Sequence, residues 1–307
     1  MSAVDPRTRA AGPARPPRRA IVAAYVAITK PRIIELLLVT TVPTMILAAG
    51  GWPDPLRMIA VIVGGTLAAA GASTFNSVYD RDIDQLMERT AHRPVASGLI
   101  SAKSGTIFGS ILSLLSVVIL AVFTTPLAAV LGAIAIAAYA FVYTVILKRR
   151  TAQNIVWGGA AGCMPVLIGW AAITGSLTWA PVVLFFVVFW WTPPHYWPLS
   201  LRYRDDYAKA GVPMLPVIAP PKTVMRHIGV YSVLMVATSW LLIPAGNMGW
   251  VYSISAGILG VAFLAEVLRL WLRVRTDAAD LAPMRLFHGS ITYLALLFLA
   301  VAIDPFV

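Results

Sequence analysis

The chain is dominated by long apolar runs separated by short polar gaps. The runs cover residues 33–51, 57–79, 105–124, 127–147, 153–173, 179–198, 225–245, 249–271 and 286–303. Each is close to the about 20 residues that an α-helix needs to cross a hydrocarbon core roughly 30 Å thick. The runs lack the alternation that marks the strands of a membrane β-barrel. The pattern therefore predicts an all-α, polytopic membrane helical bundle with about nine transmembrane helices.

Composition supports this interpretation. Of the 307 residues, 59% are hydrophobic and 12% are charged, whereas about a quarter of a soluble domain is charged. This excludes a water-soluble globule. We expect a disordered basic tail over residues 1–24 and a single membrane-embedded domain over 25–307. The sole cysteine, Cys163, lies in an apolar run and can form no internal disulfide.

The basic residues are distributed asymmetrically. The 24 basic and 13 acidic residues give a net charge of +11, and 23 of the 24 lie in gaps on one side of the membrane, with only Arg57 on the other. This obeys the positive-inside rule, so the basic excess is an orientation signal and no nucleic-acid partner is expected. The tail lacks the apolar core of a signal peptide. We expect a plasma (inner) membrane protein with a cytoplasmic N-terminus; a mitochondrial inner membrane is the alternative.

An acidic row follows the second apolar run. Asn76, Asp80, Asp84 and Glu88 are spaced by four residues, which predicts one helix face. Because neighbouring carboxylates repel each other, the row needs a cation, and Mg²⁺ prefers such oxygen ligands together with substrate phosphates. The row therefore indicates a metal-bound diphosphate. The alternative is a solvated acidic helix end paired with arginines. Those arginines are Arg81, Arg89 and Arg93.

Basic residues lie directly after this row and in two other gaps on the same side. Arg89 and Arg93 follow the acids, and guanidinium groups suit phosphate oxygens. An equally simple interpretation is that these arginines only enforce topology. The same choice applies to the basic groups beside the first and fourth runs. These are Lys30, Arg32, Lys148, Arg149 and Arg150.

A second polar segment, FFVVFWWTPPHYWPLSLRYRDDYAKAGVPMLP, covers residues 185–216. Its aromatic residues fit an interfacial belt, but aromatic faces beside a diphosphate can also stabilise an allylic cation. The segment continues into His195 and then Asp205 and Asp206, a second acidic point on the same side. The four histidines form no zinc-binding pattern.

Four segments give the chain a family resemblance. They are TKPRI at 29–33, NSVYDRDIDQLMERTAHRP at 76–94, YTVILKRRTAQNIVWGGAAG at 143–162 and WTPPHYWPLSLRYRDDYAKAGVPMLP at 191–216. They resemble the intramembrane aromatic prenyltransferase superfamily and, within it, the protohaem IX farnesyltransferase (haem O synthase) family. The resemblance implies a nine-helix fold whose central cavity opens toward the cytoplasm. It also implies transfer of a farnesyl group from farnesyl diphosphate to a vinyl group of haem B, with addition of water.

The resemblance also implies roles for individual residues. The expected Mg²⁺ ligands are Asn76, Asp80, Asp84 and Asp206. The expected catalytic residues are Asn76, Asp80, Asp84, Arg89 and Arg93. The expected substrate-binding residues are Lys30, Lys148, Arg149, His195, Tyr196, Trp197, Asp205 and Asp206. In this set His195 is a candidate for contacting the haem iron or a propionate, and the acids around Asp206 are fewer than in quinone-making relatives.

Three other functions remain open at this stage. A membrane haem transporter would also use many apolar helices, although transporters tend to carry ionisable groups near the midplane. Prenylation of a quinone precursor is a second alternative, and a catalytically inert haem-binding or assembly protein is a third. The expected partners are the bilayer and, for the product, haem A synthase or terminal oxidase assembly factors.

Overall fold

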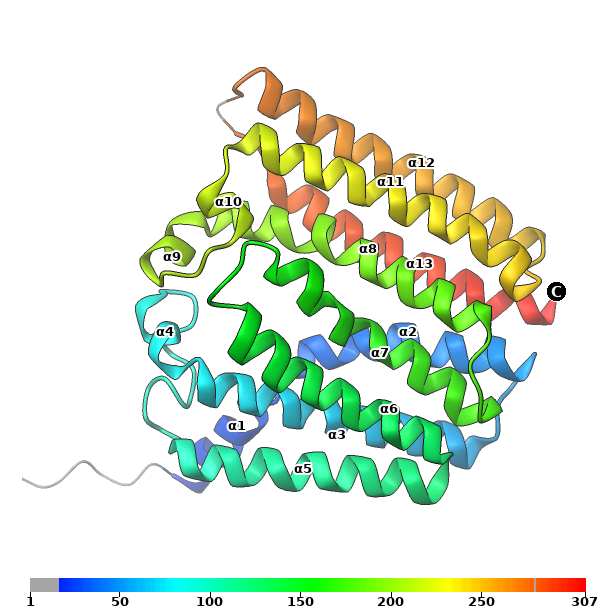
Figure 1. The fold of residues 1–307 in the computed structure, drawn as a ribbon, viewed down its shortest axis with the longest axis horizontal. Coiled ribbons are helices and arrows are strands. Elements are labelled where there is room, and N and C mark those ends of the chain that lie inside the picture. The colour runs from blue at the N-terminus through cyan, green and yellow to red at the C-terminus, as the bar shows by residue number, and fades with distance from the viewer. Residues whose placement is uncertain (1–16, 279) are drawn as a thin grey trace, which may run out of the picture.

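The computed structural model describes residues 17–278 and 280–307, and every regular element in these ranges is helical. The long helices lie side by side, and three short ones, α4, α9 and α10, lie together at one end of the bundle (Figure 1). The elements are α1 (Arg18–Ile28), α2 (Pro31–Ala49), α3 (Pro55–Tyr79), α4 (Arg81–Leu86), α5 (Ala102–Phe123), α6 (Pro126–Ala137), the π-helix η1 (Ala138–Leu147), α7 (Asn154–Thr174), α8 (Trp179–Arg202), α9 (Arg204–Lys209), α10 (Leu215–Ile218), α11 (Pro221–Gly246), α12 (Trp250–Arg275), α13 (Pro283–Ile303) and the 3₁₀ turn η2 (Asp304–Phe306).

Eight helical segments of the described chain have the length and composition to cross a membrane. They correspond to eight of the nine expected runs, with α6 and η1 forming one segment. The remaining run, 179–198, forms α8, which has 24 residues and three internal prolines and is not among the eight. The predicted all-α membrane bundle is confirmed.

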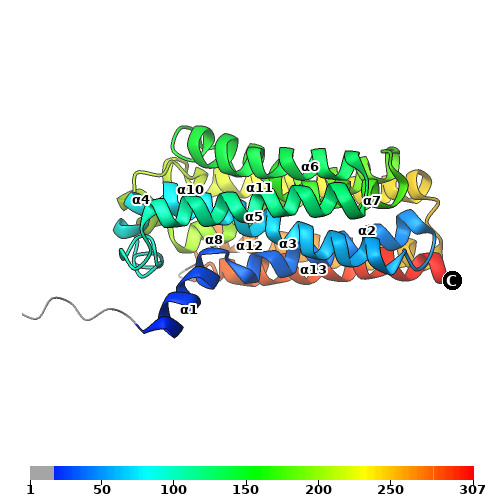
Figure 2. The same ribbon diagram turned by 90° about the horizontal axis from the view of Figure 1, so that it is seen from below.

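The N-terminal helix α1 differs from the expectation of a disordered tail up to residue 24. It begins at Arg18 and leaves the bundle at an angle (Figure 2). Ala24 and Ile28 are buried in a small cluster with Val95 and Ile100. This packing gives α1 an apolar face that orders it, which the basic composition of the segment concealed. Residues 1–16 of the expected tail lie outside the described residues.

Helices α3 and α5 approach each other closely through small residues. A Cβ atom placed on Gly71 would lie 2.4 Å from Oγ of Ser113, and one on Gly109 would lie 3.3 Å from the carbonyl oxygen of Gly71. Small residues allow such backbone contact between membrane helices, where van der Waals packing replaces the hydrophobic driving force. This contact holds the half of α3 that leads to the acidic row.

Several long helices contain proline, and one departs from α geometry. Pro43, Pro165 and Pro244 lie within α2, α7 and α11. Such prolines are tolerated in membrane helices because neighbouring groups satisfy the freed carbonyls. The helix that starts as α6 widens into η1 from Ala138 onward. π-Helical turns are rare and occur frequently at functional sites.

Candidate active site

The acidic row lies where α3 ends and α4 begins. The backbone N–H of Asp80 donates to the carbonyl of Asn76 at 2.9 Å, and that of Asp84 donates to the carbonyl of Asp80 at 2.8 Å. This bonding continues the helical spacing across the boundary, so the three side chains share one face. Asn76, Asp80 and Asp84 are only 3%, 0% and 2% exposed. Three of the four members of the row are therefore together and buried.

Glu88 does not belong to this group. Helix α4 ends at Leu86, and Met87 has an extended backbone with φ −105° and ψ 125°. Glu88 then lies in a turn and is exposed. The prediction of four acids and amides on one helix face is wrong at this position, because the helix does not continue that far.

Asn76 connects the row to distant parts of the chain. Its Nδ2 donates to Oδ2 of Asp80 at 2.7 Å and to Oγ1 of Thr144 at 3.2 Å. Its Oδ1 accepts from Nζ of Lys30. Thr144 lies in η1, and its hydroxyl donates to the carbonyl of Tyr139 at 2.8 Å. Sequence reasoning missed Thr144, since a lone threonine in an apolar run carries no signal of its own.

Lys30 is held in the site at a cost. Its backbone is left-handed, with φ 55° and ψ 62°, a conformation that costs a non-glycine residue about 1–2 kcal/mol. Burial lowers the pKa of its ammonium to about 7; Arg93 and Lys148 act in the same direction, and Asp80 and Asp84 oppose them. Backbone strain of this kind concentrates at functional sites. Lys30 thus has the features of a residue retained for binding.

Asp80 is the most enclosed carboxylate. Its Oδ2 forms an ion pair with Nζ of Lys148, and its Oδ1 lies 3.6 Å from Nη2 of Arg149. Oδ1 is buried and accepts no hydrogen bond within the described part of the chain. A buried anionic oxygen without a donor is unfavourable unless a ligand or cation approaches it. This oxygen is therefore the best candidate for contact with a bound group.

Two arginines pair with the other carboxylates of this loop. Nη1 of Arg93 lies 2.9 Å from both oxygens of Asp84. Arg149 donates to both oxygens of Asp82 at 2.7 Å, and this hydrogen bonding lowers the pKa of Asp82 to about 2. A solvated, arginine-paired helix end describes Asp82, whose side chain is 61% exposed, but not Asp84, at 3%.

Arg89 points to a different partner. Its Nη2 donates to the hydroxyl of Tyr207 at 3.2 Å, and this hydroxyl lies 2.9 Å from that of Tyr196. Its guanidinium also lies over the ring of Tyr203, 5.4 Å from the centroid. Burial raises the pKa of Tyr207 well above its ordinary value, so its hydroxyl stays protonated. These contacts join the first polar segment to the second. Sequence reasoning did not single out Tyr207.

His195 and Trp197 contact other helices. Nδ1 of His195 lies 2.8 Å from Oγ of Ser290 in α13. The imidazole stacks between Trp191, at 4.1 Å, and Phe287, at 4.6 Å. Trp197 is fully buried, with its ring edge-on to His227 and Tyr231 of α11. Both residues therefore pack against α11 or α13, and no hydrogen bond joins either to the acidic row within the described residues.

Asp205 and Asp206 lie in the first turn of the short helix α9. Asp205 is exposed and Asp206 is half-buried. Neither forms an ion pair with another described residue. The structure therefore gathers Lys30, Asn76, Asp80, Asp84, Arg93, Lys148 and Arg149 into one cluster, and it links Arg89 and Tyr196 through Tyr207.

An apolar cavity of about 110 Å³ begins next to the cluster. Ser73, one turn before Asn76 on α3, and Tyr139 of η1 line it. The other lining residues come from α2, α3, α6, η1 and α7, and they are Ile33, Ile34, Leu37, Leu38, Thr41, Val61, Gly65, Ala68, Ala69, Ala72, Ala135, Ile136, Ala161, Gly162, Pro165 and Ile168. The lining contains no charged residue. The site therefore combines an ionic cluster with an adjoining space suited to hydrocarbon.

The donor atoms of the cluster fit a hard divalent cation. The described residues contain no group of three or more His, Cys, Asp and Glu side chains placed to hold a metal, so a site for a soft metal is not formed. The amide oxygen of Asn76 and the carboxylates of Asp80 and Asp84 are oxygen ligands of the kind that Mg²⁺ prefers. The unbonded Oδ1 of Asp80 supplies an open position for it.

Comparison with known proteins places this geometry in a family. Residues 37–291 match the UbiA prenyltransferase family. The chain belongs to this family. It is 56% identical to a protoheme IX farnesyltransferase of Nocardioides sp. over 288 residues, covering 93% of this chain and 91% of that protein. It is 52% identical to protoheme IX farnesyltransferase 1 of Saccharopolyspora erythraea, covering 99% of this chain and 97% of that protein.

Solved structures support the UbiA fold. A digeranylgeranylglyceryl phosphate synthase structure superposes with a TM-score of 0.76 at 18% identity, covering 93% of this chain and 99% of that chain. A UbiA homologue from Archaeoglobus fulgidus bound to DMAPP and Mg²⁺ superposes with a TM-score of 0.65 at 17% identity, covering 91% and 99%. At this identity the likeness establishes the helical architecture of this UbiA-family chain.

Proposed function

We propose that this protein converts haem B to haem O by transferring a farnesyl group from farnesyl diphosphate to a porphyrin vinyl group. The observation that carries the proposal is the buried cluster of Asn76, Asp80 and Asp84, bordered by cations and by an apolar cavity. The names of relatives more than 50% identical over most of the chain support the choice of substrates.

The cluster is suited to binding the diphosphate. Asn76, Asp80 and Asp84 would hold Mg²⁺, with Asp206 as a further ligand, and the bound ion would supply positive charge to the diphosphate oxygens. Lys30, Lys148 and Arg149 would bind the same anion directly. The ammonium groups now pair with Asn76 and Asp80, so an arriving anion finds them already placed. Charge placed in advance requires no reorganisation during the reaction.

The reaction needs charge stabilisation at two points. The bond between C1 of the farnesyl group and the diphosphate oxygen breaks, and its electron pair leaves with the diphosphate, toward Lys148, Arg149 and Arg93. The allylic cation left behind forms a new C–C bond with the terminal vinyl carbon. Water then adds its oxygen to the inner vinyl carbon and releases a proton. Farnesyl diphosphate, haem B and water thus give haem O and diphosphate.

Aromatic side chains near the cluster are suited to the cationic stage. Tyr139 lines the cavity and lies 5.4 Å from Tyr143, centroid to centroid. Tyr196 and Tyr207 are hydrogen-bonded to each other beside Arg89. The faces of such rings attract cations through their quadrupole. Trp197 is less suited to this role than the sequence indicates, since its ring is enclosed by α11.

His195 is proposed to contact the haem iron. The hydroxyl of Ser290 donates to the carbonyl of Phe287 at 2.6 Å, so it accepts from Nδ1–H of His195. This hydrogen bond selects the tautomer whose Nε2 carries a lone pair, as in many metal-binding histidines. Trp191 and Phe287 hold the ring by stacking. The arrangement leaves Nε2 as the nitrogen able to bind iron.

The proposal includes a setting for the reaction. The multi-pass membrane character follows from the apolar helices. We place the protein in the plasma membrane with a cytoplasmic N-terminus because of the charge asymmetry of the gaps. The ionic cluster then faces the side on which soluble diphosphates occur. Haem A synthase or terminal oxidase assembly factors would receive the product.

Mass spectrometry of extracted haems tests the proposal. The purified protein is incubated in lipid nanodiscs with haem B, farnesyl diphosphate and Mg²⁺, and the Asp80→Ala variant is the control. The expected product is a haem heavier by one farnesyl group plus water, absent with the variant. Unchanged haem B together with prenylation of a hydroxybenzoate or naphthoate would overturn the proposal in favour of a quinone pathway.

A further inference from the structure

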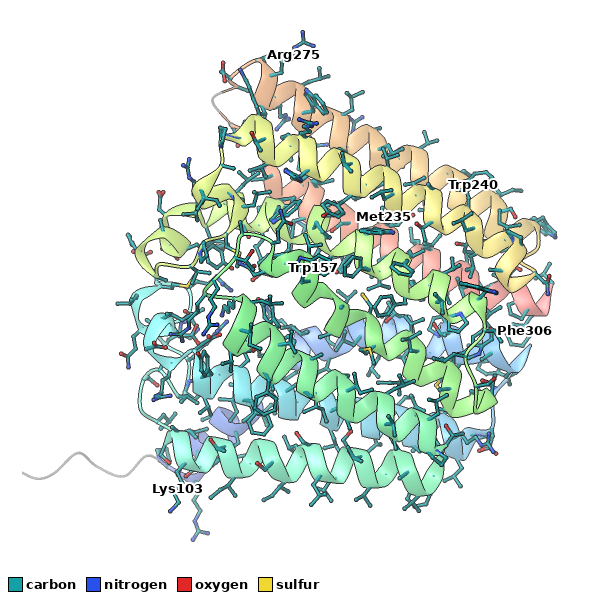
Figure 3. The ribbon with its side chains drawn as sticks, in the orientation of Figure 1. Lys103, Trp157, Met235, Trp240, Arg275 and Phe306 are labelled. Carbon is teal, nitrogen blue, oxygen red and sulfur yellow. The ribbon has the colours of Figure 1, made fainter. Side chains whose placement is uncertain are left out.

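A second cavity lies far along the chain from the acidic row, between the end of α12 and the start of α13. Its volume is about 440 Å³. It lies at the end of the bundle that also holds α9 and α10, as the position of Arg275 at the tip of α12 shows (Figure 3). Its lining residues are Glu266, Arg269, Leu270, Leu272, Arg273, Leu281, Ala282, Arg285 and Leu286. The proposed reaction uses none of them.

The lining has a net positive charge. Three arginines face one carboxylate, that of Glu266. Arg269 forms an ion pair with this carboxylate, and Nη2 of Arg285 lies 3.6 Å from the same oxygen. Arg273 is half-buried and forms no ion pair within the described residues. One acid cannot balance three guanidinium groups, so the cavity is suited to an anion.

The cavity also opens onto lipid-facing surface. Leu272 lines it and is 49% exposed, and one turn earlier on α12 Leu268 is 55% exposed. The exposed stripe continues along the helix through Val261 and Ile258. A molecule with its anionic group among the arginines therefore has an apolar surface beside it for hydrocarbon chains. Trp271, at 44% exposure, lies at the same level, as expected for the interface region of a membrane.

We propose that this cavity binds the headgroup of an anionic phospholipid, with the acyl chains lying along the exposed stripe of α12. Basic pockets between membrane helices recognise lipid phosphates in this way, and guanidinium groups match phosphate oxygens in geometry. Charge complementarity selects an anionic lipid over a zwitterionic one. The continuity between Arg273, Leu272 and Leu268 selects a lipid over a free anion.

Native mass spectrometry of the purified full-length protein in detergent tests this. Phosphatidylglycerol and phosphatidylcholine are titrated against the wild type and against Arg273→Gln. We expect the variant to bind phosphatidylglycerol about fivefold more weakly, on the order of the contribution of one arginine near a charged membrane surface, and to bind phosphatidylcholine as the wild type does. Arg275→Gln is the matched control, because Arg275 is exposed on the same helix and does not line the cavity.

Further arms separate the sources of the effect. Glu266→Gln removes the only acid of the cavity, so it should tighten phosphatidylglycerol binding. Equal weakening in Arg273→Gln and Arg275→Gln would overturn the proposal in favour of general surface charge. Displacement of the lipid by inorganic phosphate would assign the cavity to a free anion. Displacement by haem B would assign it to porphyrin propionates. Either result overturns the lipid assignment.

Discussion

Two polar segments, residues 76–94 and 191–216, lead to the same end of the bundle, where α4 and α9 lie (Figure 1), yet their acids have different surroundings. In the first segment Asp80 and Asp84 are buried and paired with Lys148 and Arg93. In the second, Asp205 is exposed, and no ion pair of the described residues involves it. Burial of charge is expensive and is kept where a ligand or function requires it. The difference places the diphosphate chemistry at the first segment.

The largest expected effect comes from exchanging the two kinds of acid. Asp80→Ala should reduce farnesyl transfer by about 10²–10³-fold, because it removes charge placed at the reacting centre. Asp205→Ala should leave turnover within about threefold of the wild type, as surface changes away from a site have small effects. The measurement is initial-rate haem analysis on folded, membrane-inserted protein. Similar losses in both variants would remove the contrast.

Arg93 tests the cations of the first segment. Arg93→Gln should raise the KM for farnesyl diphosphate about 10- to 100-fold, the range for a lost hydrogen bond to a charged group. The control is Arg81→Gln, because Arg81 is exposed and donates only to the carbonyl of Val78. Steady-state kinetics at saturating haem B measure the effect. An unchanged KM in Arg93→Gln would limit this arginine to a structural role.

His195 tests the second segment. His195→Ala should weaken haem binding about tenfold, as loss of a metal ligand or its orienting partner does, and should leave farnesyl diphosphate binding unchanged. His92→Ala is the control, since His92 is exposed. Absorption titration with haem B reports the affinity and the iron coordination. Wild-type haem affinity and spectrum in the variant would refute iron contact at His195.

The smallest expected effect concerns Asp82, the exposed acid of the first segment. Its pKa is lowered from 3.8 to about 2 by hydrogen bonds from Arg149. The stabilising contribution of the pair is therefore complete above about pH 4 and is lost as the pH falls toward 2. Asp82→Asn should lack this component, so its unfolding temperature should fall less than that of the wild type over the same interval. Parallel curves for the two proteins would contradict the ion pair.

Local pattern was sufficient for much of this protein. Apolar runs of spanning length predicted the helical bundle, because a membrane requires every backbone group of a span to be bonded within the segment. The spacing of Asn76, Asp80 and Asp84 predicted their shared face, because backbone hydrogen bonds continue through Asp80. The same spacing failed at Glu88, where the chain leaves the helix after Leu86. Periodicity carries information only as far as the helix continues.

The partners of these residues depended on tertiary structure. Lys30 and Asn76 are 46 residues apart, Lys148 and Asp80 are 68 apart, and Arg89 and Tyr207 are 118 apart. Side-chain period determines which face of a helix a residue occupies, but not which helix packs against that face. Close approach at Gly71 and the widened turn of η1 determine those neighbours. The sequence thus determined the spans and the acidic face, and packing alone decided which cations, hydroxyls and rings surround it.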